Sequence, residues 1–367
     1  MKVTAAVFEA VGREMTIEEL ELEDPKAGEV LVRLVASGVC HSDFHVVKGE
    51  WEAKGPLVLG HEGAGVVEKI GPGVSTVEVG DHVVLSWVPY CGHCSYCRSG
   101  RPALCPQVQE TAYANVMADG TSRLSRNGET VYSYLTTGSF ADRVVVPASG
   151  AVPIRKDAPL DKVALIGCAV ATGVGAVTKT ANVRPGDSVL IIGCGGVGLS
   201  AVMGAALVSA GEIIAVDLSD ESLERAKSLG ATSTINPGHQ SVPDRVRAIV
   251  GNDGVDWAFE VIGLKPTLEM AYELTRPGGT TVVVGQSADG VTIEIAPMLM
   301  SDREKSLIGS NYGSCHPALD FPRLVDLYMR GKLDLDQLIS RHATIHDIND
   351  AFAAMGARQA GRTIITY

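Results

Sequence analysis

The chain has 367 residues, which is enough for two domains of ordinary size. Hydrophobic residues make up 46% of it and charged residues 20%, and these fractions exclude a disordered or fibrous protein. The 43 Asp and Glu residues outnumber the 31 Lys and Arg residues, and the net charge of -12 argues against binding to nucleic acid or to an anionic membrane. We therefore expect a soluble protein that acts on small molecules.

The first 150 residues have the pattern of an irregular β-rich domain, with short apolar runs at 30–35, 65–70 and 82–87 separated by Pro-Gly and Gly-Asp turns. From about residue 187, strands alternate with helices, which predicts a parallel sheet covered by helices on both faces. The expected strands are 187–193, 212–217, 231–237, 255–263, 280–286 and 363–367; the expected helices end near Ala210, run from Ser219 to Lys227, surround Val246 and Met270, and lie near 324–328 and 348–355.

The N-terminal segment and the cysteines indicate the compartment. The charged residue Glu9 comes too early for the N-terminal segment to contain the long apolar run of a signal peptide. We therefore expect a cytoplasmic protein. Residues 188–211 carry no charge, but the glycines clustered at their centre favour a buried strand, turn and helix over a membrane helix. Without an export signal, the eight cysteines favour metal ligands or buried thiols over a disulfide framework.

Four cysteines lie close together in one loop, at Cys91, Cys94, Cys97 and Cys105. Four thiolates this close in sequence can close around a tetrahedral Zn²⁺ and leave no open coordination position, so the pattern predicts a structural zinc site. The alternative is four unrelated buried thiols, but buried cysteines normally lie in apolar surroundings and this loop is polar.

A glycine-rich turn follows the strand expected at 187–193. Gly193, Gly195 and Gly198 match the G-x-G-x-x-G fingerprint of dinucleotide binding, with Gly196 inside the same turn. A helix and a second strand follow, and that strand ends in Asp217, whose carboxylate can bind the ribose hydroxyls of NAD and repel the 2′-phosphate of NADP. The turn therefore predicts an NAD site, and the alternative is a packing turn without a ligand.

Three further segments contain metal-ligating side chains between glycines and apolar residues, around Cys40, His61 and Cys168. Two thiolates and one imidazole make a zinc site whose fourth position is open, as catalytic zinc requires. Their spacing alone does not show that they meet, and a single buried cysteine is more often a small core residue.

With these segments, the sequence resembles the zinc-dependent medium-chain alcohol dehydrogenases, including the glutathione-dependent formaldehyde dehydrogenases, over essentially its whole length. The matching motifs are Gly60-His61-Glu62 with Gly65, Gly71 and Val74 at the family spacing, the four-cysteine loop, residues 193–198 and residues 259–263. The resemblance implies an α/β protein with a doubly wound Rossmann domain that binds NAD at 170–312. It also implies a β-rich, GroES-like catalytic domain at 1–169 and 313–367, with the substrate between the two domains.

The resemblance also assigns roles to individual residues. It implies that Cys40, His61 and Cys168 bind a catalytic zinc, the second zinc of the subunit, and that Asp43 and Glu62 orient the ligands. His41 and Arg362 are expected to contact the cofactor pyrophosphate, and Thr172 and Val197 to lie on the nicotinamide side.

Ser42, the nicotinamide ribose and His45 resemble a proton relay that carries the alcohol proton to solvent. The alternatives are a serine that only hydrogen-bonds to nearby backbone and a histidine that is a solvated loop residue.

The substrate is less constrained. Residues 106–135 resemble the long loop of dimeric members, so we expect a homodimer, with a homotetramer as the alternative. Gln109 stands where glutathione-dependent enzymes have an arginine for a substrate carboxylate, which disfavours glutathione adducts. Trp51 and Trp87 resemble pocket-lining residues and favour primary aliphatic or aromatic alcohols, although both are also ordinary packing aromatics.

Three functions follow from these residues. The first is an NAD-dependent alcohol dehydrogenase that interconverts primary alcohols and aldehydes. The second is a formaldehyde dehydrogenase that requires a thiol, glutathione or mycothiol, because parts of the last 60 residues resemble bacterial mycothiol-using enzymes. The third is a catalytically silent zinc- and NAD-binding structural protein, which the intact Cys40, Ser42, His61 and Cys168 argue against.

Overall fold

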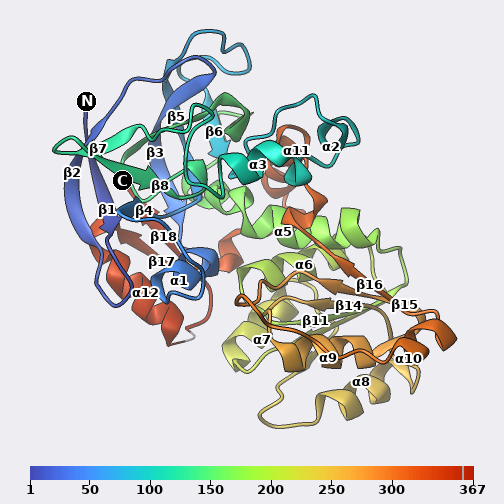
Figure 1. Cartoon of the computed structure of the whole chain (residues 1–367). Coiled ribbons are helices and arrows are strands. Elements are labelled where there is room, and N and C mark those ends of the chain that lie inside the picture. The colour runs from blue at the N-terminus through green and yellow to red at the C-terminus, as the bar shows by residue number, and fades with distance from the viewer. Residues whose placement is uncertain (358) are drawn as a thin grey trace. The chain divides into compact units, whose positions relative to one another are not determined.

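The computed structural model describes residues 1–357 and 359–367 and divides them into two compact units (Figure 1). Unit 1 comprises Met1–Cys168, Cys315–Gly331 and Ile339–Tyr367, and unit 2 comprises Ala169–Ser314 and Lys332–Leu338. The last of these segments belongs to the range 313–367 that was expected in the catalytic domain. In this segment, the carbonyl of Gln337 accepts a hydrogen bond from Arg225 at 2.7 Å.

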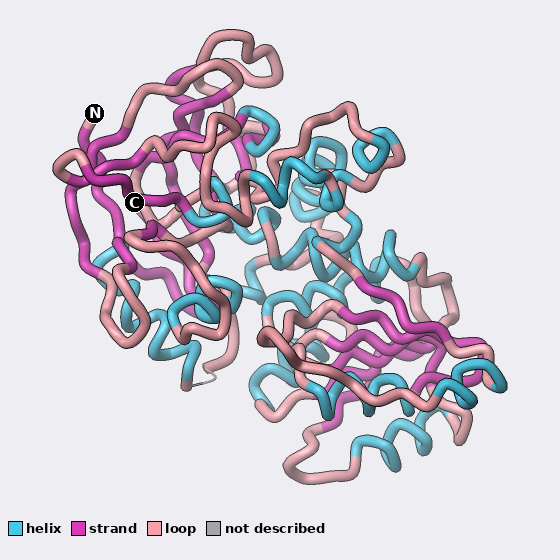
Figure 2. The backbone as a smooth tube through the Cα atoms, in the orientation of Figure 1, coloured by secondary structure: helices cyan, strands magenta, loops and turns pink. Residues whose placement is uncertain are grey.

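Unit 1 contains a β-barrel and a second β-sheet, in both of which most strand pairs are antiparallel; strands are magenta in Figure 2. A closed barrel has the order β1-β2-β7-β8-β4, and a second sheet has the order β10-β6-β5-β3-β18-β17 with β9 paired to β3. The barrel strands are β1 (Lys2–Phe8), β2 (Thr16–Leu22), β4 (Leu57–Val58), β7 (Leu124–Arg126) and β8 (Glu129–Ser133). The sheet strands are β3 (Glu29–Gly38), β5 (Glu62–Ile70), β6 (His82–Leu85), β9 (Arg143–Pro147), β10 (Ala151–Ile154), β17 (Ile339–Thr344) and β18 (Arg362–Thr366).

Short helices connect these strands. The α-helices are α1 (His41–Val47), α2 (Ser95–Arg98), α3 (Pro106–Glu110), α4 (Leu160–Val163), α11 (Pro317–Met329) and α12 (Ile348–Gly356). The 3₁₀ turns are η1 (Pro102–Leu104), η2 (Tyr134–Thr136), η3 (Ala148–Gly150), η4 (Ala164–Gly167) and η8 (Ile345–Asp347).

The core of unit 1 lies where β3 pairs with β5, and there Val30, Val32 and Leu34 are almost completely buried. Because β-branched and aliphatic side chains pack well on a pleated surface, such runs form strands. The prediction of a β-rich first domain is therefore confirmed.

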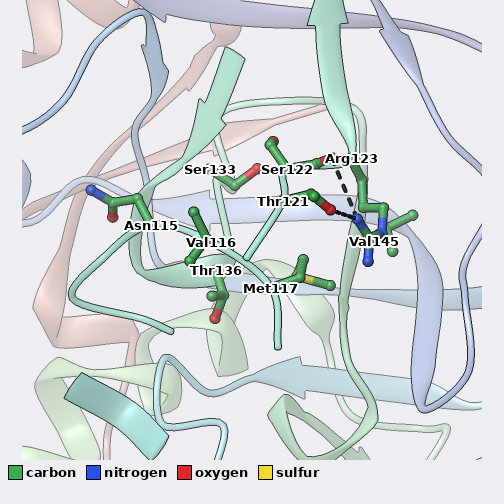
Figure 3. Close-up of a pocket in the computed structure, with 9 residues that line it drawn as sticks. All are labelled: Asn115, Val116, Met117, Thr121, Ser122, Arg123, Ser133, Thr136 and Val145. Atoms are coloured by element: carbon green, nitrogen blue, oxygen red, sulfur yellow. Dashed lines mark hydrogen bonds between the residues drawn. The ribbon is translucent and has the colours of Figure 1, made fainter. Parts of the chain in front are cut away.

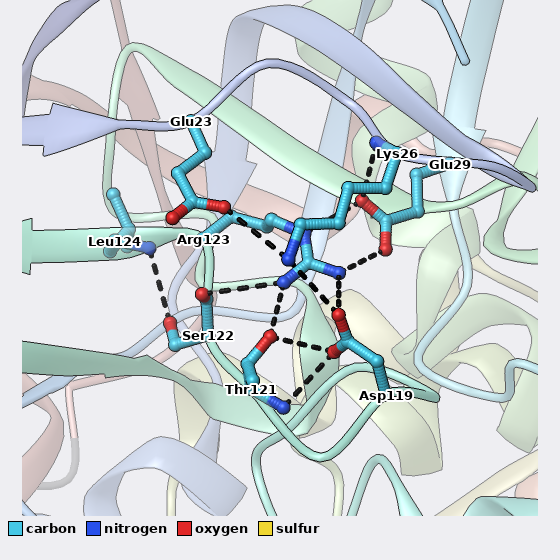
Figure 4. Close-up of polar contacts among 8 residues, drawn as sticks. All are labelled: Glu23, Lys26, Glu29, Asp119, Thr121, Ser122, Arg123 and Leu124. Atoms are coloured by element: carbon cyan, nitrogen blue, oxygen red, sulfur yellow. Dashed lines mark hydrogen bonds and ion pairs between the residues drawn. The ribbon is translucent and has the colours of Figure 1, made fainter. Parts of the chain in front are cut away.

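A buried arginine anchors the long segment 106–135 to β3. The side chain of Arg123 is 2% exposed, and its Nε donates to Glu29 on β3 at 2.8 Å while Nη2 donates to Asp119 at 2.9 Å (Figure 4). Its Nη1 also donates to Thr121, so every nitrogen of the guanidinium is satisfied. A small pocket lies beside this anchor, and its lining contains none of the predicted site residues (Figure 3).

Unit 2 is an open, fully parallel sheet with the strand order β13-β12-β11-β14-β15-β16, the doubly wound order of a Rossmann domain. Its strands are β11 (Ser188–Ile192), β12 (Glu212–Val216), β13 (Ser233–Ile235), β14 (Val255–Glu260), β15 (Thr275–Val283) and β16 (Ser306–Gly309). Its helices are α5 (Ala169–Gly175), the π-helical η5 (Ala176–Ala181), α6 (Gly196–Leu207), α7 (Asp220–Ser228), α8 (Val242–Val250), α9 (Lys265–Glu273), α10 (Pro297–Asp302), η6 (Tyr312–Ser314) and η7 (Asp336–Leu338).

Helices cover both faces of this sheet, as predicted. Leu190 and Ile214 pack with Val246 of α8 and Ala271 of α9 on one face, and α6 lies on the other (Figure 1). Ser219 caps α7 through a hydrogen bond from the Ser222 backbone N–H to its hydroxyl, at 3.2 Å.

The segment 188–211 forms β11, the glycine turn and α6, which confirms its prediction as strand, turn and helix. In the described ranges, no single helix is long and apolar enough to cross a membrane, although Leu160–Gly167 and Ala169–Ala181 meet that test as a bent pair. The alternation was predicted only to about residue 285, and α10 and β16 continue it.

Candidate active site

Cys40, His61 and Cys168 come together in unit 1, although they lie far apart in sequence. One ligand atom from each of them and one from Glu62 all lie within 4.8 Å of one another, and all four residues are buried. Cys40 precedes α1, His61 immediately precedes β5, Glu62 begins β5, and Cys168 follows η4. Two sulfurs and an imidazole are a donor set that zinc prefers, so the cluster has the chemistry of a zinc site.

The buried carboxylate of Asp43, on α1, organises this cluster. It accepts the backbone N–H of Cys40 at 3.3 Å, the backbone N–H of Gly60 at 2.8 Å and Nδ1 of His61 at 3.2 Å. Because an ionised carboxylate only accepts, His61 carries its proton on Nδ1 and presents Nε2 as the ligand atom. Gly60 has φ +89°, and a Cβ there would come within 2.7 Å of the Phe140 nitrogen, so the turn that delivers His61 requires glycine.

Glu62 lies closer to the ligands than the sequence suggested. Its carboxylate pairs with the buried guanidinium of Arg362 on β18, and a Cβ on Gly38 would lie 2.1 Å from its Oε2. Arg362, expected at the cofactor pyrophosphate, thus lies at the metal cluster and is 5% exposed. Its contact with a phosphate stays a prediction.

The charges of the cluster are strongly coupled. A hydrogen bond with Cys168 holds the pKa of the Cys40 thiol well below its ordinary value, while the pKa of Cys168 is raised by the same bond and by burial. Burial raises the pKa of Glu62 to about 7, although Arg362 opposes this rise. Burial alone would lower the pKa of His61, but the charges of Asp43 and Cys40 raise it. The buried cluster is therefore suited to a cation that compensates the Cys40 thiolate.

The four loop cysteines form a second cluster, whose sulfurs all lie within 4.8 Å of one another. The Sγ atoms of Cys94 and Cys97 are 3.5 Å apart and those of Cys91 and Cys97 are 3.9 Å apart. A tetrahedron with Zn–S bonds of about 2.3 Å has edges of about 3.8 Å, so this spacing suits a zinc ion. Hydrogen bonds from the backbone near His93 and Cys94 lower the pKa of Cys91 to about 6, which favours its thiolate.

The glycine fingerprint forms the turn between β11 and α6 in unit 2. Gly193 has φ +101°, and a Cβ on Gly198 would lie 1.8 Å from the Gly193 carbonyl oxygen, so these two glycines allow the turn and its close packing. A Cβ on Gly195 would meet nothing within 4 Å, which leaves open space at the N-terminus of α6. The backbone N–H groups at such a helix start can bind a diphosphate, so the residues present suit a dinucleotide.

The remaining cofactor candidates of unit 2 lie close to this turn. Asp217 follows β12, and its carboxylate accepts the backbone N–H of Cys194 at 2.7 Å and that of Ser219 at 2.8 Å. Thr172 is on α5 and Val197 on α6, and a Cβ on Gly173 would lie 2.2 Å from the Val197 carbonyl oxygen. Gly196 opens α6 beside Val197.

Ser42 and His45, expected in the relay, lie on α1 together with His41, which was expected at the pyrophosphate. Ser42 Oγ lies 3.9 Å from the Cys40 sulfur, His45 is partly buried, and His41 is exposed at the helix start. Sequence reasoning missed Tyr134, whose ring meets that of His61 edge-on at 5.8 Å and whose hydroxyl donates to the Ser42 carbonyl at 3.4 Å. No motif marked Tyr134, because the contact depends on the fold of η2.

Comparison with known proteins finds family matches in both units. Residues 26–156 match the alcohol dehydrogenase GroES-like domain, and residues 196–330 match the zinc-binding dehydrogenase domain. Proteins named S-(hydroxymethyl)glutathione dehydrogenase from Synechocystis sp. and Escherichia coli are each 39% identical over the whole of both chains. The crystal structure of benzyl alcohol dehydrogenase from Acinetobacter calcoaceticus is 34% identical with a TM-score of 0.94, covering 100% of this chain and 99% of that one. An alcohol dehydrogenase zinc-binding domain protein from Burkholderia ambifaria is 37% identical with a TM-score of 0.96 and the same coverage.

Proposed function

Since the chain belongs to the zinc-dependent medium-chain alcohol dehydrogenase family, we propose that it interconverts primary alcohols and aldehydes with NAD. The observation that carries this proposal is the buried cluster of Cys40, His61 and Cys168. The cluster would offer zinc two sulfurs and one nitrogen, and because the Glu62 carboxylate pairs with Arg362, a fourth position would be left for a substrate oxygen. The four-cysteine loop would hold a second, structural zinc.

The chain's own residues divide the chemistry between them. When bound, zinc supplies a Lewis acid that favours the ionised form of the substrate hydroxyl, and NAD supplies the hydride acceptor. Asp43 holds Nδ1 of His61 and would so leave the other ring nitrogen to bind the metal. Ser42 would accept the hydroxyl proton and pass its own proton on toward His45, from which a proton would leave to solvent.

The cofactor residues favour NAD over NADP. The open space at Gly195 admits a diphosphate at the start of α6, and the Asp217 carboxylate would bind ribose hydroxyls and repel a 2′-phosphate. Val197 and Thr172 would lie on the nicotinamide side, and His41 and Arg362 would contact the pyrophosphate.

Aliphatic or aromatic primary alcohols are the proposed substrates. Gln109 is exposed on α3 and is neutral, so it offers no charge-assisted bond to the carboxylate of a glutathione adduct. The likeness to benzyl alcohol dehydrogenase supports aromatic substrates. The relatives named S-(hydroxymethyl)glutathione dehydrogenase favour a second candidate, a thiol-dependent formaldehyde dehydrogenase.

A kinetic screen separates these candidates. NADH absorbance is followed with benzyl alcohol, hexanol and formaldehyde, each with and without glutathione or mycothiol. Turnover of benzyl alcohol or hexanol without thiol supports the proposal, and Gln109→Arg should then leave it unchanged. Oxidation of formaldehyde only in the presence of a thiol would establish the second candidate. If none of these substrates is turned over, with or without a thiol, the third candidate, a catalytically silent protein, is supported.

We also propose a cytoplasmic homodimer. β16 is the edge strand of the sheet in unit 2, and the neighbouring helix α10 exposes Met298 to 73% and Leu299 to 54%. An exposed sheet edge beside apolar side chains is a surface that a second copy can cover. A solution mass of two chains by light scattering supports this assembly, and a mass of one or four chains contradicts it.

A further inference from the structure

The chain reverses directly after α1 and folds back onto that helix. Gly49 has φ +73°, the left-handed conformation that commonly ends a helix. The backbone N–H groups of Glu50 and Trp51 then both donate to the carbonyl of His45, at 2.9 Å and 3.3 Å. This reversal places the side chains of Glu50 and Trp51 beside the imidazole of His45.

Two contacts hold the His45 ring in one orientation. Nδ1 is hydrogen-bonded to Oε2 of Glu50, and the Trp51 ring stacks on the imidazole with a centroid distance of 4.4 Å and an interplanar angle of 24°. The second oxygen of Glu50, Oε1, accepts from Lys48 Nζ at 2.7 Å. The carboxylate is therefore oriented by Lys48 while it holds His45.

The chemistry of this contact determines which ring nitrogen is protonated. The bonds from Lys48 and His45 hold the pKa of Glu50 below its ordinary value, so Glu50 is ionised at neutral pH and can only accept. In the neutral imidazole the proton must then lie on Nδ1, which leaves Nε2 as the nitrogen that takes up a proton. The same logic governs a catalytic triad, in which a carboxylate fixes the tautomer of the base.

We propose that Glu50 is a positioning residue of the proton relay, which fixes His45 as the Nδ1–H tautomer with Nε2 as its proton acceptor. This inference rests on the relay in the proposed function. Among the contacts described, His41 on α1 interacts electrostatically with His45, and Lys48, the residue that ends the helix, binds Glu50. Neither His41 nor Lys48 carries a carboxylate, so Glu50 provides the negative charge among these described contacts.

The first test reads the tautomer by ¹⁵N NMR of histidine-labelled protein at a pH where His45 is neutral, with the signal assigned through His45→Gln. The wild-type ring should show a protonated Nδ1. Glu50→Ala should move His45 toward the Nε2–H tautomer, and Glu50→Gln, which keeps an acceptor oxygen, should move it less. The exposed neighbour Glu52 gives the matched control, because Glu52→Ala removes a carboxylate from the same segment and should leave the tautomer unchanged.

The second test is kinetic. Glu50→Ala should lower kcat about 10-fold, less than the roughly 10²–10⁴-fold that a complete general base contributes, and should leave KM nearly unchanged. Its solvent isotope effect should rise because proton transfer becomes more limiting, and Glu50→Asp should recover part of the rate. Glu52→Ala should behave as wild type in both measurements.

The two tests separate the possible failures. A wild-type His45 protonated on Nε2, or a Glu50→Ala variant that keeps the wild-type tautomer, overturns the role of Glu50. A purely structural role would lower stability without moving either the tautomer or the isotope effect, and it would also overturn the proposal. Absence of alcohol oxidation by the wild type would refute the proposed function, while the NMR spectrum would still decide whether Glu50 sets the tautomer.

Discussion

Replacement of Asp43 by asparagine tests how the metal cluster is held. The Asp43 side chain is completely buried, and its two oxygens accept from Cys40 N, Gly60 N and His61 Nδ1. Asparagine has nearly the same shape but offers one oxygen and one NH₂ group. At least one of the three donors therefore faces another donor, and the bond to His61 loses its negative partner.

The magnitude follows from these contacts. Each buried donor left without an acceptor costs about 1–3 kcal/mol, so the free energy of unfolding should fall by about that amount. Loss of a hydrogen-bond partner behind a metal-binding histidine typically weakens metal binding by about 10–100-fold, which is about 1.4–2.7 kcal/mol. Asp43→Asn should therefore lose zinc from one site at a chelator concentration roughly ten or more times lower than the wild type requires.

The assay is a chelator titration with a colorimetric zinc indicator. The four-cysteine site serves as an internal reference, because none of its ligands contacts Asp43 in the described structure. Asp24→Asn is the matched control, since the Asp24 side chain is 70% exposed and binds only the surface residue Lys69 among the contacts described. Equal release curves for Asp43→Asn and the wild type would refute the reasoning.

Four further predictions concern the other sites. Cys94→Ser should lower the zinc content by one ion per chain and reduce the melting temperature, and an unchanged zinc content by elemental analysis would contradict the structural site. A Cβ at position 198 would lie 1.8 Å from a backbone oxygen, so Gly198→Ala should destabilise unit 2 by more than about 3 kcal/mol. Gly195→Ala should leave stability unchanged and weaken NAD binding in calorimetry, and wild-type affinity would count against the diphosphate site. Arg123→Met leaves the Glu29 carboxylate buried without its partner, so we expect a loss of about 3–5 kcal/mol and of roughly 10 °C in the melting temperature; a change below about 2 °C would contradict the anchoring role.

The features that the sequence predicted well are local in the chain. The strand, turn and helix around Gly193 and Gly198 follow from steric demands within six residues, and the four-cysteine loop lies within fifteen residues. Alternating strands and helices likewise fix the parallel sheet, because each crossover must cover one of its faces. The short strand β16 was not predicted, because its four residues are at most partly buried and show no clear alternation of apolar and polar side chains.

The features that the sequence left open depend on long-range contacts. Only the resemblance to a family suggested that Cys40, His61 and Cys168 meet, and the pairing of Glu62 with Arg362 crosses from β5 to β18. Glu50 is different, because it is close in sequence to His45. The sequence did not predict its contact with His45, because the contact depends on the left-handed conformation of Gly49, which brings the side chain of Glu50 back to α1.

The most direct test of the central claim is the zinc content per chain of the wild type and of Cys40→Ser, measured by elemental analysis. Two donor clusters predict two zinc ions in the wild type and one in the variant, with NAD-dependent alcohol oxidation lost together with that ion. A wild type that holds one zinc ion per chain, or a Cys40→Ser variant that keeps both the metal and the turnover, would contradict the account.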